Sequence, residues 1–116
     1  VVTPYWPVGD RMVRRFFTEE GWEVVALKGL KCSSPVNIAE QSEAVMRAAI
    51  QEVNESDPDA IVQVGTNLCM ARLADEAERW LGKPVIAINT AIYWYALRAN
   101  GIADRMPGWG ALMRDH

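Results

Sequence analysis

Residues 59–68 read DAIVQVGTNL, and this stretch decides the fold. Residues 60–64 are nearly all apolar, as is typical of a strand buried in a parallel sheet. Gly65 breaks this pattern, and Thr66-Asn67 leads into a helix predicted over residues 68–81. A strand, a glycine turn and a helix in this order form part of a strand–helix–strand unit, so they predict an α/β protein.

The same alternation continues outward in both directions. Further strands are predicted over residues 1–3, 23–27 and 85–88, and further helices over residues 10–20, 38–54 and 91–100. Asp10 is expected to cap or enter the first of these helices. The elements predict a single α/β domain over residues 1–116, with an open parallel four-stranded sheet and helices on both of its faces. Because the chain starts with a strand and without Met, we expect it to be part of a longer protein.

Helical spacing predicts which side chains the helices bury. The first helix is expected to bury an apolar face made of Met12, Val13, Phe16 and Phe17. The long helix is expected to bury Ala44, Val45, Ala48, Ala49 and Val53.

Charge and composition exclude several classes of function. The formal net charge is -3 and the densest basic pair is Arg14-Arg15, so no nucleic-acid partner is expected. No apolar run reaches the roughly 18 residues of a membrane span, and no signal peptide is expected, because no basic start leads into an apolar run. The single histidine, His116, argues against a zinc site or a histidine triad. Two distant cysteines, Cys32 and Cys69, favour a reducing, cytoplasmic setting.

A binding site is expected where the strands end, because ligands of open parallel sheets bind beyond the carboxyl ends of the strands. Gly65 allows a close backbone approach, and Thr66 and Asn67 add a hydroxyl and an amide. The N–H groups at the start of the following helix favour an anion such as a carboxylate. The alternative is that Thr66 or Asn67 only caps the helix, and spacing alone favours this alternative.

Three further features of the sequence leave alternatives open. Tyr5 could donate a proton or a hydrogen bond at the end of the first strand, or it could cover the sheet edge together with Trp6. Cys69, near a helix start, could be a reactive thiolate, but a small buried hydrophobic residue is the favoured reading; Cys32 is expected to be structural. Residues 93–95 (YWY) cannot share one helix face, so they could contact another domain or a second copy in a homo-oligomer, or one of them could be an ordinary, partly exposed aromatic side chain.

Four segments together resemble one known family. They are Thr3-Pro4-Tyr5, residues 59–68, residues 78–85 (ERWLGKPV) and the turn 107–110 (PGWG) followed by Leu112. In this order and spacing the sequence resembles the aspartate/glutamate racemase superfamily, in its maleate isomerase and arylmalonate decarboxylase branch. The resemblance covers almost the whole chain.

The resemblance implies a fold of two similar α/β halves related by a pseudo-two-fold axis, with the active site between them. This chain would be the second half, and an amino-terminal half-domain would be its partner. The resemblance implies no cofactor and no metal, and a small mono- or dicarboxylate as substrate. In such enzymes each half typically presents a cysteine, one acting as base or nucleophile and the other as proton donor.

Individual roles follow only where residues match the family pattern. Tyr5, next to Pro4, matches the family's assisting tyrosine, and Thr66 and Asn67, followed by Leu68, match the carboxylate-binding loop. The family's cysteine would fall at Gly65, where this chain leaves room for substrate instead. Two-thiol racemisation is therefore not expected, and the resemblance favours a maleate isomerase-like isomerase, or a decarboxylase, whose single thiol lies on the first half.

Two alternatives to this enzyme remain. One is a non-catalytic small-carboxylate-binding or regulatory domain that has lost the cysteine. The other is a flavodoxin-like signalling domain, which is ranked low because the strand ends carry neither an acidic cluster nor a phosphate-binding loop.

Overall fold

A computed structural model describes residues 1–116 in full. The four strands are β1 (Val2–Thr3), β2 (Lys28–Gly29), β3 (Ile61–Gln63) and β4 (Val85–Ala87). The helices are α1 (Pro7–Glu19), α2 (Pro35–Ala39), α3 (Glu43–Asn54), α4 (Ala71–Leu81), α5 (Ile88–Ala99) and α6 (Ala111–Asp115). None of these helices is long and apolar enough to cross a membrane.

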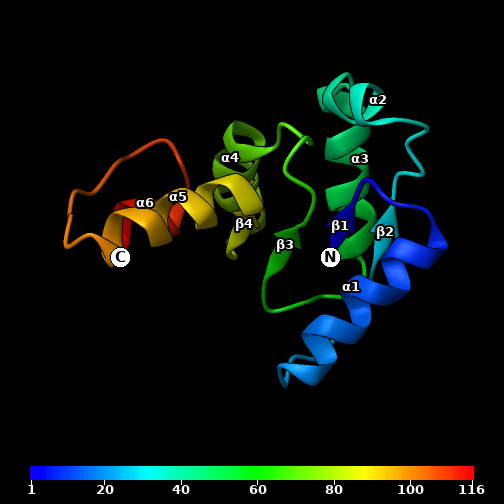
Figure 1. The fold of residues 1–116 in the computed structure, drawn as a ribbon, viewed down its shortest axis with the longest axis horizontal. Helices are drawn as coiled ribbons and strands as arrows, with labels where there is room; N and C mark the ends of the chain where they lie inside the picture. Colours follow the sequence, from blue (N-terminus) through cyan, green and yellow to red (C-terminus); the bar gives the residue numbers. More distant parts are fainter.

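All strand pairs are parallel, and the strand order is β2-β1-β3-β4 (Figure 1). Val2 pairs with Lys28 on one side and with Gln63 on the other, so β1 lies between β2 and β3. The chain leaves β1 toward one edge of the sheet and then returns through α3 to build the other edge. The predicted open parallel four-stranded sheet is confirmed, and its switch point lies between β1 and β3.

The second strand was predicted at the wrong residues. Residues 23–27 form no strand, and pairing begins at Lys28, whose N–H donates to the carbonyl of Val1. The β-branched residues Val24 and Val25 suggested a strand, but the register opposite Val2 starts only at Lys28.

The hydrophobic core lies between the sheet and the pair of helices α3 and α4. The strands β3 and β4 alternate, so that Ile61, Gln63, Val85 and Ala87 face this core and are buried. The helices contribute one stripe each, made of Met46, Ala49, Ile50 and Val53 from α3 and Leu73, Ala74 and Ala77 from α4.

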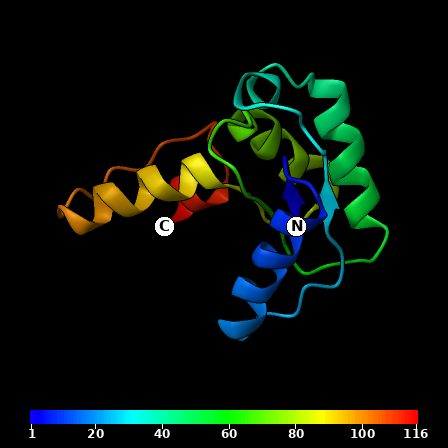
Figure 2. The ribbon, with the colours of Figure 1, turned by 45° about the vertical axis from the view of Figure 1, so that its right-hand side comes forward.

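The opposite face of the sheet is only partly covered. Figure 2 shows α1 and α3 on opposite sides of β2, so helices lie on both faces as predicted. No residue of α1 is fully buried, however, and Met12 and Phe16 are 70% and 59% exposed, so the predicted buried face of α1 is wrong within this chain. Val62 and Ile86, which point to this face, are half-buried.

Three helix boundaries differ from the prediction. The first helix begins at Pro7, which suits the first helical position, so Asp10 lies in the first turn rather than at the cap. The fourth helix begins at Ala71, not at residue 68, and the fifth begins at Ile88, which places Asn89 and Thr90 inside a helix.

The predicted long helix is two helices. Ser34 caps α2 by accepting the N–H of Asn37, and Ser42 starts α3 by accepting the N–H of Val45. The buried stripe of α3 includes Ala49 and Val53, as predicted, but Val45 is 42% exposed and Ala44 and Ala48 are exposed too.

The segment formed by α5 and α6 extends away from the sheet (Figures 1 and 2). Two acidic side chains of α4 hold its last part: Asp75 accepts the N–H of Gly110 at 3.0 Å, and Glu78 accepts the N–H of Ala111 at 2.7 Å. Burial by itself raises the pKa of Asp75, but hydrogen bonds from Arg79 and Gly110 outweigh this and hold that pKa below its ordinary value.

Candidate functional site

The ends of β1 and β3 bring three of the predicted site residues together. A Cβ atom built on Gly65 would lie 2.6 Å from Cγ and Cδ of Pro4 and 3.6 Å from the hydroxyl oxygen of Tyr5. Gly65 has φ +105°, a backbone conformation that favours glycine. Pro4 and Gly65 are both buried and pack against each other at the carboxyl edge of the sheet, so the ring of Pro4 fills the space beside Gly65 that was predicted to be left for substrate, and the half-buried Tyr5 lies next to them.

The segment after Gly65 is a tight turn with free donors. The N–H of Leu68 donates to the carbonyl of Gly65 at 3.1 Å, and the N–H of Met70 donates to Leu68. The N–H groups of Thr66 and Asn67 donate to no acceptor in the chain, and both side chains are exposed. Adjacent free N–H groups in a turn suit an anion, and a carboxylate is the anion that the resemblance implies.

Neither Thr66 nor Asn67 caps the following helix. The residue at the N-cap of α4 is Met70, and no side chain accepts a capping hydrogen bond there. The alternative that these residues only cap the helix is therefore wrong. Leu68 is fully buried in the core, so its side chain anchors the end of the turn to the core.

Sequence reasoning missed two residues that hold this turn in place. Gln63 is fully buried, and its Nε2 donates to the carbonyl of Gly65 at 2.7 Å while its Oε1 accepts the N–H of Ile88. Asn89 donates from Nδ2 to the carbonyl of Thr66 at 2.9 Å. The signal for Gln63 was present, because an amide inside an apolar strand needs buried partners.

Tyr5 is positioned by a second set of hydrogen bonds. Thr3, which is fully buried, accepts the N–H of Tyr5 at 3.1 Å and donates to Asp10 at 2.5 Å. The carbonyl of Tyr5 accepts the N–H of Lys31. A Cβ on Gly29 would lie 2.7 Å from that carbonyl, which explains why glycine follows Lys28.

Neither cysteine of this chain lies at position 65, where the resemblance implies the family's cysteine. Cys32 is buried beside Pro4, whose carbonyl accepts its N–H, and burial raises the pKa of its thiol, so the neutral form is favoured. Cys69 is exposed and precedes α4, so the favoured prediction of a small buried residue inside the helix is wrong. No cluster of histidine, cysteine and carboxylate side chains could hold a metal ion.

The site thus has hydrogen-bond donors but no cysteine at position 65, and the exposed thiol of Cys69 donates to the carbonyl of Asn67. Tyr5 offers a hydroxyl that forms no hydrogen bond within the chain, and the Gly65–Leu68 turn offers two free N–H groups. Such donors can bind a carboxylate or stabilise developing negative charge on oxygen. The fold and the site define the class: a doubly wound α/β domain with a polar turn at the switch point of its sheet.

The chain belongs to the arylmalonate decarboxylase family, whose model matches residues 1–113. No curated protein matches the sequence.

Solved structures agree with this assignment. Maleate cis-trans isomerase from Nocardia farcinica, as a cysteine-to-serine mutant with a covalently bound succinylcysteine intermediate, is 26% identical with a TM-score of 0.93 and covers 99% of this chain. Maleate isomerase from Pseudomonas putida S16 is 28% identical with a TM-score of 0.91 and covers 98% of this chain. An arylmalonate decarboxylase is 25% identical with a TM-score of 0.85 and covers 97%.

The chain spans about half the length of these relatives. It matches 47% of the Nocardia farcinica chain, 46% of the Pseudomonas putida chain and 51% of the decarboxylase chain. The predicted racemase-like half fold and the predicted family are therefore confirmed. The related proteins are isomerases and decarboxylases.

Proposed function

We propose that this chain is the second half of a cofactor-independent isomerase or decarboxylase that acts on a small mono- or dicarboxylate. The observation that carries the proposal is the position of the Tyr5 hydroxyl beside Gly65, next to the free N–H groups of Thr66 and Asn67. These donors suit a carboxylate group. The catalytic thiol would come from a companion half, by which we mean a further α/β half like the one that the relatives possess.

A maleate isomerase-like reaction fits a site with a single thiol. The thiolate of the companion half adds to one carbon of the double bond, and the electron pair moves onto the neighbouring carboxylate as an enolate-like charge. The former double bond is then a single bond and can rotate. Elimination then releases the thiolate and the trans acid. The succinylcysteine found in a cysteine-to-serine mutant of a related isomerase supports this route, because a covalent adduct there formed while one cysteine was absent.

In this scheme the chain supplies the groups that hold the substrate. The N–H groups of Thr66 and Asn67 bind one carboxylate, and the hydroxyl of Tyr5 donates to the oxygen on which charge develops. Both cysteines of this chain are free thiols, which supports a reducing, cytoplasmic location.

The test compares the full-length protein with the 116-residue chain. With maleate, the full-length protein is expected to produce fumarate and to carry, on a cysteine outside this chain, an adduct with the mass of one maleate. The chain alone is expected to produce none, because it lacks the catalytic thiol of the companion half. Turnover of maleate or of a malonate by the chain alone would contradict the proposal.

A second candidate function is a non-catalytic carboxylate-binding domain, and the glycine at position 65 favours it. Full-length protein that binds malonate or maleate but turns over neither would support this alternative. A companion half without a cysteine at the matching strand end would support it as well.

A further inference from the structure

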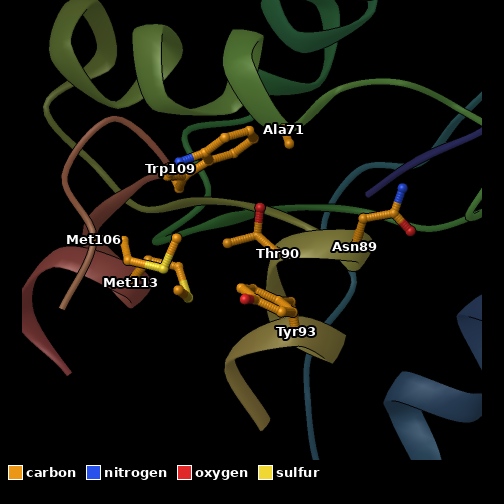
Figure 3. A pocket seen from close by; sticks show the side chains of 7 residues that line it. All are labelled: Ala71, Asn89, Thr90, Tyr93, Met106, Trp109 and Met113. Carbon is orange, nitrogen blue, oxygen red and sulfur yellow. The ribbon is translucent and has the colours of Figure 1, made fainter. Parts of the chain in front are cut away.

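A cavity of about 200 Å³ lies between the start of α4, the first turns of α5 and the last segment of the chain. Figure 3 shows its walls, which are Ala71, Thr90, Tyr93, Met106, Trp109 and Met113, with Asn89 at its edge. No charged side chain lines it. The proposed carboxylate site does not use this cavity.

One polar atom inside the cavity has no partner. Thr90 is only 8% exposed, and its hydroxyl oxygen forms no hydrogen bond. Figure 3 shows this hydroxyl pointing toward the side of the cavity formed by Ala71 and Trp109. A buried hydroxyl without a partner is costly, so a ligand atom that pairs with it gains more than it would at the surface.

Size and lining define the chemistry of such a ligand. An apolar cavity of about 150 Å³ is large enough for benzene, so this one accommodates a single six-membered ring with one small substituent. Methionine sulfur and aromatic rings make favourable contacts with an aromatic ligand. Because no charged side chain lines the cavity, an ionised group on the ligand is disfavoured there. The hydroxyl of Thr90 can pair with one neutral hydrogen-bonding atom of the ligand.

We propose that this cavity is a binding site for a single aromatic ring that carries one neutral hydrogen-bonding group, which pairs with the hydroxyl of Thr90. Asn89, at the edge of the cavity, donates to the carbonyl of Thr66, but neither Thr66 nor Asn67 lines the cavity. The ligand is a free, uncharged phenol-like molecule, because no charged side chain lines the cavity to pair with an ionised group. This inference does not rest on the proposed function.

The test titrates full-length protein with phenol and with toluene, followed by ligand-detected NMR. Ligands of this size reach a Kd of about 1 mM or tighter, and the hydroxyl pair makes phenol bind about fivefold tighter than toluene. Thr90→Val is expected to abolish this preference and keep toluene binding. The matched control Thr18→Val, on an exposed helix elsewhere, is expected to keep the preference. Ala71→Phe fills the cavity and is expected to abolish binding of both ligands.

Several outcomes would overturn the inference. One is that no phenol binds at a phenol concentration about ten times the expected Kd, which is the result if a side chain of the companion half fills the cavity. Another is a phenol preference that survives Thr90→Val, and a third is binding that survives Ala71→Phe. Phenylacetate tests whether the ligand must be neutral: binding at least as tight as that of phenol would overturn the inference, because phenylacetate carries an ionised group and no neutral group to pair with Thr90. None of these readouts needs turnover, so they stand apart from failure of the proposed function.

Discussion

The ring of Pro4 occupies the space that any side chain on Gly65 would need. A Cβ at that position would lie 2.6 Å from two carbon atoms of the ring, a separation that real Cβ contacts do not show. Gly65 also has φ +105°, which disfavours every residue with a Cβ. A cysteine at position 65, which the resemblance implies for the family, would therefore require both a different backbone conformation and a shift of Pro4.

Gly65→Ala is expected to destabilise the protein by about 2–4 kcal/mol, because left-handed strain and the clash with Pro4 add up. Gly21→Ala is the matched control: Gly21 has φ +87°, but a Cβ there meets nothing within 4 Å. The control is expected to cost about 1 kcal/mol from the backbone alone. Urea unfolding of both variants measures the difference. Equal losses of stability in the two variants would show that Pro4 can shift without an energetic cost.

Much of the fold could be predicted because it depends on local patterns. The apolar run before Gly65 and the alternation of strands and helices identified the parallel sheet, and glycine and proline marked the turns. The second strand was misplaced because pairing register is a non-local property, set here by Val2 opposite Lys28. The exposed face of α1 could not be predicted, since helical spacing shows that a face is apolar but not whether anything covers it.

Ile50→Ala is expected to lower the free energy of unfolding by about 2–5 kcal/mol, because Ile50 is fully buried between α3 and the sheet. Val45→Ala on the same helix is the control and is expected to change stability by no more than about 0.5 kcal/mol. Chemical denaturation of the two variants tests which stripe of α3 faces the core. A larger loss of stability in Val45→Ala than in Ile50→Ala would show that the stripe predicted from the sequence faces the core.

The candidate site was predictable only in part. The rule that ligands bind where parallel strands end selected Tyr5 and the turn after Gly65, and the structure places them side by side. Asn89 could not be found in this way, because its contact with Thr66 joins segments 23 residues apart and depends on α5 starting one turn earlier than predicted. The sequence pattern likewise placed the free N–H groups of the turn at the start of a helix, but that helix begins only at Ala71.

The last segment of the chain is expected to loosen in acid. The pKa of Asp75 is lowered in the folded protein from its ordinary value of 3.8, so the stability that Asp75 contributes is present above that pH and is lost as the pH falls through the lower folded pKa. Asp75→Asn should mimic the loss at neutral pH, costing about 1–2 kcal/mol, with faster hydrogen exchange at the N–H of Gly110. Asp59→Asn, at an exposed position, is the control. Unchanged exchange at Gly110 in Asp75→Asn would contradict this role.

Tyr5→Phe tests the part of the site that depends on a single atom. The hydroxyl of Tyr5 forms no hydrogen bond within the chain, so its removal is expected to leave stability unchanged within about 0.5 kcal/mol. If the full-length protein turns over a carboxylate, the same change is expected to lower turnover by about 10²-fold, the range for a positioned proton or hydrogen-bond donor. Tyr95→Phe, at a position that is 68% exposed, is the control and should leave both quantities unchanged. Normal turnover in Tyr5→Phe would remove Tyr5 from the mechanism, whereas a loss of stability without a loss of turnover would make it a structural residue of the sheet edge.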